Sequence, residues 1–193
     1  MYHFTRVRRA LVVGLAAVAA TLSMTQVANA EPAGPNLPPD VAAKIGVPAG
    51  NKVFLVGHAT GVQSYKCNAT TSTWETASTP DAKLVDDKGK LVATHFGGPT
   101  WQARDGSTVV GSLPPKASAP SPDGSIAWLL LTAKSTAPGP DGGQFVNTTF
   151  IQRVKTTGGV GPVGSCTAAQ TPVMNVPYTA DYYFWKATGP GAR

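Results

Sequence analysis

Residues 91–111 read L-V-A-T-H-F-G-G-P-T-W-Q-A-R-D-G-S-T-V-V-G, and this stretch predicts three short antiparallel strands joined by tight turns. Gly97–Pro99 interrupts the first run. Asp105-Gly106 is typical of a two-residue hairpin turn, in which both residues take positive φ. Counting outward from these turns pairs His95 with Trp101, and Trp101 with Val110.

Side chains alternate along a strand, so this register divides the meander into two faces. The predicted apolar face collects Leu91, Ala93, His95, Trp101, Ala103, Thr108 and Val110. Gln102 and Arg104 fall on the other face. We therefore expect His95 on the covered face, as a hydrogen-bonded and partly buried residue against Trp101.

The first 30 residues have the pattern of a secretory signal peptide. Basic residues including Arg8 and Arg9 precede an apolar run from Ala10 to Met24, and the small-residue motif Ala28-Asn29-Ala30 follows. A membrane span needs about 20 apolar residues, and this run is shorter. We expect a secreted protein, extracellular or periplasmic, with cleavage after Ala30 and no transmembrane segment in the mature chain. The Arg8-Arg9 pair leaves the twin-arginine and general export routes open.

The composition argues against a nucleic-acid partner and favours a turn-rich fold. The chain carries 16 Lys and Arg against 10 Asp and Glu, a net charge of +6. Three of these arginines lie in the signal segment, so the mature chain carries +3. It has no basic cluster, which argues against a nucleic-acid partner. Gly and Pro number 21 and 17, and only 13% of residues are charged, so long helices are not expected.

The sequence predicts a mostly β protein, a single antiparallel β-sandwich or barrel-like domain. Residues 31–51 form a Pro-rich extended leader with a short helix at Asp40–Ile45, 52–187 form the β-rich domain, and 188–193 a flexible tail. Within the domain we expect a hairpin of Lys52–His58 and Val62–Asn68, a central strand at Ile126–Leu131 covered on both faces, a long strand at Phe145–Lys155 and a closing strand at Val176–Trp185.

The mature chain contains two cysteines, Cys67 and Cys166. An even pair in an exported chain predicts a disulfide, and two cysteines allow a single intramolecular pairing. Such a bridge would tie the early strands to the late part of the chain.

Several motifs resemble one known family. They are H-F-G-G-P-T-W-Q-A-R-D-G-S (95–107), W-L-L-L (128–131), I-Q-R-V-K-T-T-G-G (151–159), Cys166 and V-P-Y-T-A-D-Y-Y-F (176–184). Together, from about Val53 to Lys186, they resemble secreted bacterial and fungal proteins known as the domain of unknown function 3455. The resemblance implies a single exported β-rich domain and supplies no catalytic assignment.

Motifs for cofactor chemistry are weak. Gly159–Gly164 fits G-x-G-x-x-G, but a proline lies inside it and no amphipathic helix follows, so a dinucleotide site is not expected. The mature chain has two histidines, His58 and His95, which with Asp105 or Asp181 could form a two-histidine, one-carboxylate metal set. No spacing along the chain prearranges these ligands, so neither a metal nor a cofactor is predicted.

Hydrolytic chemistry also lacks a signature. There is no G-x-S-x-G nucleophile elbow, and no pair of carboxylates can be named from the acids, which lie mostly in turns. Arg153 and Asp181 are candidates for an internal ion pair. The aromatic residues Trp74, Trp101, Tyr178, Tyr182, Tyr183 and Trp185 are either core or a platform for a ligand.

Two functions of different class remain. The first is a non-enzymatic binding or cell-surface module for a small molecule, polysaccharide or cell-surface ligand, and the second is a secreted hydrolase or metal-dependent enzyme. The candidate binding or buried polar site consists of His95, Trp101, Asp105, Arg153, Tyr178 and Asp181.

Overall fold

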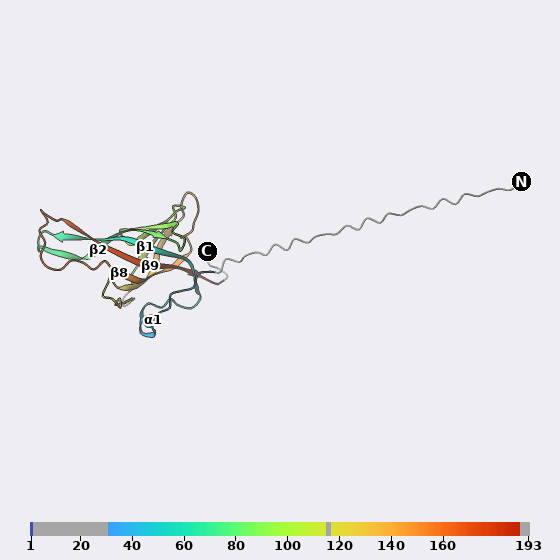
Figure 1. Cartoon of the computed structure of the whole chain (residues 1–193), viewed down its shortest axis with the longest axis horizontal. Helices are drawn as coiled ribbons and strands as arrows, with labels where there is room; N and C mark the ends of the chain where they lie inside the picture. The colour runs from blue at the N-terminus through green and yellow to red at the C-terminus, as the bar shows by residue number, and fades with distance from the viewer. Residues whose placement is uncertain (2–30, 115–116, 190–193) are drawn as a thin grey trace. The chain divides into compact units, whose positions relative to one another are not determined.

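A computed structural model describes residue 1, residues 31–114 and residues 117–189 (Figure 1). The predicted cleavage site and residues 190–193 of the predicted tail lie outside the described residues. The elements are α1 (Pro39–Ile45), β1 (Asn51–Asn68), β2 (Thr73–Val85), β3 (Leu91–Phe96), β4 (Thr100–Ala103), β5 (Thr108–Ser112), β6 (Ser118–Ala119), β7 (Trp128–Ala137), β8 (Thr148–Gly158) and β9 (Val173–Ala187).

The strands form a closed antiparallel barrel. The order is β5-β4-β3-β2-β1-β9-β8-β7, and a further pairing of β5 with β7 closes it, while β6 adds an extra strand beside β7. Neighbours in the barrel are mostly neighbours in sequence, and the first and last strands, β1 and β9, pair along nearly their whole length. Of the two predicted architectures, the barrel is therefore the one adopted.

The predicted hairpin at residues 52–68 is wrong, because β1 runs without a break through Ala59-Thr60-Gly61. Gly61 permits a close approach of strands rather than a turn. A Cβ at this position would lie 2.1 Å from the carbonyl oxygen of Asp81 on β2. Glycine is the residue that allows a neighbouring backbone to come this near.

The register of the β3–β5 meander is confirmed in its first half and wrong in its second. His95 pairs with Trp101, as predicted, but Trp101 pairs with Val109 instead of Val110. The turn between β4 and β5 has three loop residues, 104–106. The backbone amide of Ala103 donates to the carbonyl of Ser107, and the backbone amide of Gly106 donates to the carbonyl of Ala103. This is the type I turn with a left-handed third residue, Gly106 at φ +80°.

The one-residue shift exchanges the faces of β5. Val109 is fully buried, whereas Val110 and Thr108 are only partly covered. On β3 and β4 the predicted inward residues Ala93, His95, Trp101 and Ala103 are buried, and Gln102 and Arg104 are exposed, as expected. Leu91, which was also predicted to be covered, is exposed.

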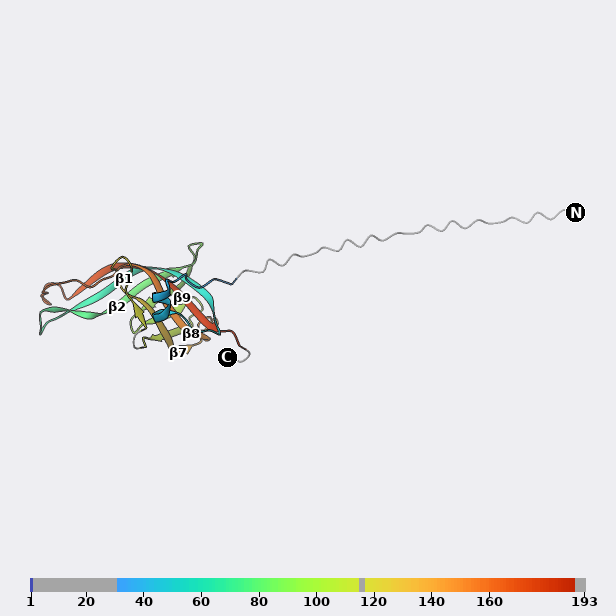
Figure 2. The ribbon, with the colours of Figure 1, turned by 90° about the horizontal axis from the view of Figure 1, so that it is seen from below.

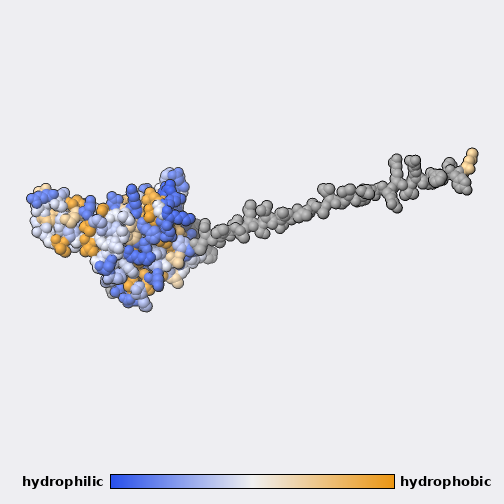
Figure 3. All heavy atoms as spheres, in the orientation of Figure 1, coloured by the Kyte–Doolittle hydropathy of each residue, from blue (hydrophilic) through white to orange (hydrophobic). Residues whose placement is uncertain are grey.

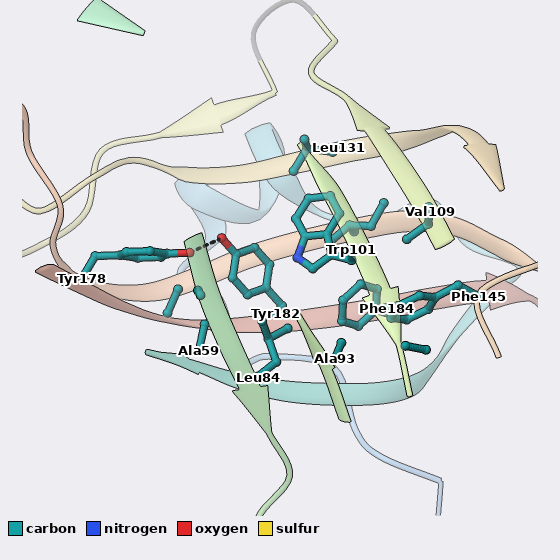
Figure 4. Packing of buried hydrophobic residues seen from close by; sticks show 14 residues of the cluster. Ala59, Leu84, Ala93, Trp101, Val109, Leu131, Phe145, Tyr178, Tyr182 and Phe184 are labelled. Atoms are coloured by element: carbon teal, nitrogen blue, oxygen red, sulfur yellow. Dashed lines mark hydrogen bonds between the residues drawn. The ribbon is translucent and has the colours of Figure 1, made fainter. Parts of the chain in front are cut away.

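The barrel interior is the main core (Figure 4). Trp101 lies at its centre with its ring edge-on to Tyr182 and Phe184, at centroid distances of 5.4 and 6.1 Å. Phe145 packs against Phe184 at 4.6 Å, and it precedes β8 rather than opening the predicted strand. These aromatic rings fill the space that eight strands enclose.

A second core lies on the outer face of β7, β8 and β9. Its buried residues include Trp128, Leu130, Val154 and Tyr183, and residues 37–47 of the leader cover them with Ile45 fully buried. The Gln152 amide donates to the Ile45 carbonyl at 2.7 Å and fixes α1 there. Since Leu131 faces the barrel interior while Leu130 faces the leader, β7 is covered on both sides as predicted.

β1, β2 and β9 continue beyond the barrel as a long ribbon (Figures 1 and 2). Cys67, at the end of β1, is bonded to Cys166 in the segment before β9, with Cα atoms 5.8 Å apart. The predicted disulfide is thus confirmed. Apolar residues on the face in Figure 3 are broken into separate patches among hydrophilic ones.

Candidate functional site

A cavity of about 480 Å³ opens into one end of the barrel. Its walls come from β1, β2, β3, β7, β8 and the two loops at Gly98 and Leu113. The lining residues are Gln63, Thr76, Ser78, Pro80, His95, Gly98, Pro99, Leu113, Leu129 and Arg153. Barrels of eight strands can hold one small ligand, and cavities of this size are typical of small-molecule sites.

His95 forms the inner wall of this cavity and is held rigidly. It is 3% exposed, and its ring stacks on Trp101 at 4.1 Å with an interplanar angle of 2°. Its Nδ1 lies 2.9 Å from the carbonyl oxygen of Thr100. A carbonyl only accepts, so Nδ1 carries the proton and Nε2 of the neutral ring is a hydrogen-bond acceptor. Nε2 has no partner among the described residues.

Burial lowers the pKa of His95 to about 4, and the nearby positive charge of Arg153 acts in the same direction, against the hydrogen bond to Thr100. The ring is therefore neutral at pH 7. A base with a depressed pKa binds its proton more readily in the unfolded chain. We expect this difference to remove about 3 kcal/mol of stability as the pH falls from about 6.5 to about 4.

The check is urea unfolding of the wild type and of His95→Phe across that pH range. Phenylalanine keeps a ring against Trp101 but does not titrate, so the loss of stability between the two pH values should be smaller in the variant. Parallel pH profiles for the two proteins would contradict the assignment of a buried neutral His95.

Arg153 brings a positive charge to the same cavity. Its Nε and Nη2 donate to the Ala127 carbonyl, at 3.1 and 2.8 Å, which orients the guanidinium. Within the described part of the chain, no carboxylate lies within salt-bridge distance of it. Arginine has five N–H groups, so three remain for another partner.

Polar and apolar groups complete the walls. The Ser78 hydroxyl donates to the Oε1 of Gln63 at 2.6 Å, which leaves the amide nitrogen of Gln63 without a partner among the described residues. Pro80, Pro99 and Leu129 supply apolar surface. The lining is thus divided between polar and apolar groups, so a ligand that fits it needs both polar groups and an apolar body.

Asp105, a predicted site residue, lies elsewhere. Its carboxylate accepts from the Ser107 hydroxyl at 2.6 Å and from the Ser107 backbone amide at 2.9 Å. It also accepts from the backbone amide of Gln144 at 2.7 Å. The hydrogen bond from the Ser107 hydroxyl is the main cause that lowers the pKa of Asp105. The side chain thus joins the β4–β5 turn to the segment before β8, a structural role.

Asp181 lies on the outside of the barrel, and the predicted ion pair with Arg153 is wrong. Arg153 pairs in register with Tyr182, and alternation along β9 turns its neighbour Asp181 to the opposite face. There Asp181 contacts Nδ1 of His58 at 2.6 Å and the Lys155 ammonium at 3.0 Å. His58 and His95 are therefore on different faces, so they do not form the two-histidine, one-carboxylate set that the sequence left open.

His58 lies between two carboxylates, since its Nε2 also contacts Asp87 at 2.8 Å. The hydrogen bond with Asp181, followed by that with Asp87, raises its pKa above 6.5. A raised pKa stabilises the folded state fully below pH 6.5, and this contribution is lost as the pH rises through the folded-state pKa. His58→Gln should therefore lower Tm at about pH 6 and have less effect at about pH 9. Thermal unfolding at both pH values tests this, and an equal effect of the substitution at both would refute it.

Of the two alternatives for the aromatic residues, core or ligand platform, the structure favours core. Tyr178 and Tyr182 are buried in the interior, with their hydroxyl oxygens 3.4 Å apart, and burial raises the pKa of Tyr178 (Figure 4). Tyr183 and Trp185 belong to the outer core under the leader, and Trp74 is half-buried on the ribbon. These rings lie on different faces, so they cannot form one flat surface.

Two features are absent from the described residues. These residues contain no group of three or more histidine, cysteine, aspartate or glutamate residues placed to hold a metal ion. No helix among them has the length and hydrophobicity that a membrane span requires.

The structure thus brings His95, Trp101, Arg153 and Tyr178 to the barrel interior and leaves Asp105 and Asp181 outside. Sequence reasoning missed Gln63, Thr76 and Ser78. The signal that could have found Thr76 and Ser78 is the alternation on β2, where they share one face with Pro80.

Comparison with known families supports the same domain. The sequence matches the family described as "Protein of unknown function (DUF3455)" over residues 48–186, which spans β1 to β9 except for the last residue. Neither the curated proteins nor the solved structures contain a match to this chain. The match covers well over half of the chain, and we conclude that this protein belongs to the DUF3455 family, with a β-barrel as its domain.

Proposed function

We propose that this chain is an exported, non-enzymatic binding protein that takes a small organic molecule into the cavity beside His95. The observation that carries the proposal is the free Nε2 acceptor of a 3% exposed histidine on the wall of a 480 Å³ cavity. Nε2 is not among the buried side-chain atoms that lack a partner, so it is accessible from the cavity, where a ligand that donates a hydrogen bond can reach it.

The other candidate functions receive less support. In the cavity the Ser78 hydroxyl donates to Gln63, so it is not in the donor relation to His95 that an activated nucleophile needs. A polysaccharide platform would need exposed rings on one face, and Trp101, Tyr178 and Tyr182 are buried. The concave site favours a small molecule.

A pair of neighbouring substitutions provides a sharp test. Thr76 and Ala77 are both exposed on β2, but Thr76 faces the cavity and Ala77 the opposite side. Thr76→Trp should fill the entrance, whereas Ala77→Trp should leave it open. A fluorinated fragment library with acidic, basic and neutral members would be screened against the wild type and both variants, with backbone amide shifts used to map binding.

We expect hits that shift the amides of Ser78, His95 and Leu129, that bind Ala77→Trp as they bind the wild type, and that lose binding to Thr76→Trp by about tenfold or more, which is 1.4 kcal/mol or more. Hits whose amide shifts map to the ribbon or the outer face, and whose affinity is unchanged in Thr76→Trp, would refute the site. Turnover of ester, peptide or polysaccharide substrates that is lost in His95→Phe would establish the hydrolase instead.

Export is the other part of the proposal. The disulfide fits an oxidising compartment, and the signal pattern predicts that the mature protein begins at Glu31. N-terminal sequencing of protein recovered outside the cytoplasm should read Glu-Pro-Ala-Gly. A chain that keeps Met1, found only inside the cell, would refute export.

A further inference from the structure

We infer that the ligand of the barrel cavity is an organic monocarboxylate that also carries an O–H or N–H group, with Arg153 binding the carboxylate and His95 accepting from the donor. This inference rests on the proposed function, and it adds the chemical class of the ligand.

The charge of Arg153 indicates which ligand charge suits the cavity. Among the described residues that line the cavity, Arg153 is the only charged one, and it is half-buried. A charge withdrawn from water is costly unless it is paired, and no carboxylate of the described residues pairs with this one. A bound anion would supply the missing partner.

The orientation of the Arg153 guanidinium determines which of its N–H groups remain for a ligand. The edge of the guanidinium formed by Nε and Nη2 is occupied by the Ala127 carbonyl, which fixes the plane of the group. The end formed by Nη1 and the second Nη2 hydrogen remains. Two parallel N–H groups of this kind match the two oxygens of a carboxylate.

The acceptor Nε2 of His95 and the apolar walls restrict which other groups the ligand can carry. His95 Nε2 is an acceptor, because Nδ1 donates to Thr100. A second carboxylate placed against it would meet a lone pair, so the site disfavours a dianion there and requires a donor. The apolar walls at Pro80, Pro99, Leu113 and Leu129 suit a hydrocarbon or aromatic body between these two polar ends.

Hydroxybenzoates carry the required groups on an aromatic ring. The probes are meta- and para-hydroxybenzoate, the corresponding hydroxybenzamides, which are neutral, and the methoxybenzoates, which lack the donor. Dissociation constants would be measured by NMR titration against the wild type, Arg153→Met and Arg153→Lys. Thermal unfolding checks that each variant is folded.

In the wild type, at least one hydroxybenzoate should bind about tenfold or more tightly than its amide and its methoxy counterpart, which corresponds to 1.4 kcal/mol or more. Arg153→Met should remove the preference for acid over amide, and Arg153→Lys should keep part of it, with added salt reducing what remains. Because Arg153 also donates to Ala127, its removal could unfold the barrel. If Arg153→Met unfolds, three other measurements test the role of Arg153. They are the ratio of acid to amide affinity in the wild type, the salt dependence of that ratio, and the same ratio in Arg153→Lys.

The outcomes separate the two proposals. Amides that bind as tightly as the acids, in a manner that Thr76→Trp abolishes, would overturn the anion inference and leave the cavity as the binding site. An acid preference that persists in folded Arg153→Met would also overturn it. If no probe and no fragment of any charge binds in the cavity, the proposed function fails as well.

Discussion

Trp101→Ala is expected to lower the free energy of unfolding by about 3 to 5 kcal/mol, the range measured for truncation of a buried tryptophan. The side chain is 1% exposed and contacts His95, Tyr182 and Phe184 by stacked or edge-on ring packing. Alanine would leave a cavity at the centre of the barrel, because the surrounding strands are paired on both sides and cannot close on it.

Urea unfolding at pH 7 measures this loss. The half-buried Trp74 on the ribbon is a matched control, since Trp74→Ala removes the same atoms outside the barrel core and should cost less than half as much. A loss below about 1 kcal/mol for Trp101→Ala would mean that the ring is not part of a close-packed core.

The second large effect belongs to the disulfide. Cys67 and Cys166 are 99 residues apart in sequence, and the chain-entropy treatment gives about 4 to 5 kcal/mol for a closed loop of about 100 residues. Replacement of both cysteines by serine should therefore cost about 2 to 5 kcal/mol, the range seen when native disulfides are removed. The barrel strands remain paired in the folded variant, because the bridge lies on the ribbon.

Two measurements check this prediction. The denatured, unreduced protein should contain no reactive thiol and gain two on reduction, and the double serine variant should unfold at a lower urea concentration than the oxidised wild type. Two free thiols in the unreduced protein would contradict the bridge. Equal midpoints for the two proteins would show that the bridge contributes no stability.

Local patterns in the sequence predicted the parts of the fold that depend on alternation. The pairing of His95 with Trp101, the long closing strand and the two-sided burial of Leu130 and Leu131 all follow from which residues share a face. The disulfide followed from the parity of the cysteines in a chain that the sequence predicts to be exported.

The errors arose where glycine has two physical uses. Gly61 permits strand contact, and in the sequence it is indistinguishable from a turn glycine. Asp105-Gly106 is compatible with both a two-residue and a three-residue loop, and the choice shifts Trp101 from Val110 to Val109. Closure of the sheet depends on the long-range pairing of β5 with β7, which no local pattern encodes.

The six residues named as a candidate site from the sequence lie in different parts of the structure. His95 and Arg153, both named from the sequence, line the cavity, but Arg153 was assigned to Asp181, because sequence alone did not show that Tyr182, and not Asp181, shares its face. The cavity itself is a product of barrel closure, since Ser78 on β2 and Arg153 on β8, which both line it, are 75 residues apart in the sequence.

The most direct test of the central claim is an NMR measurement of the two ring nitrogens of His95 at pH 7, without ligand and with the hits of the fragment screen. We expect a neutral ring with its proton on Nδ1, an unprotonated Nε2, and a shift of the Nε2 resonance on binding that disappears in Thr76→Trp. A proton on Nε2, or an Nε2 resonance that no fragment shifts, would contradict the assignment of this cavity as the binding site.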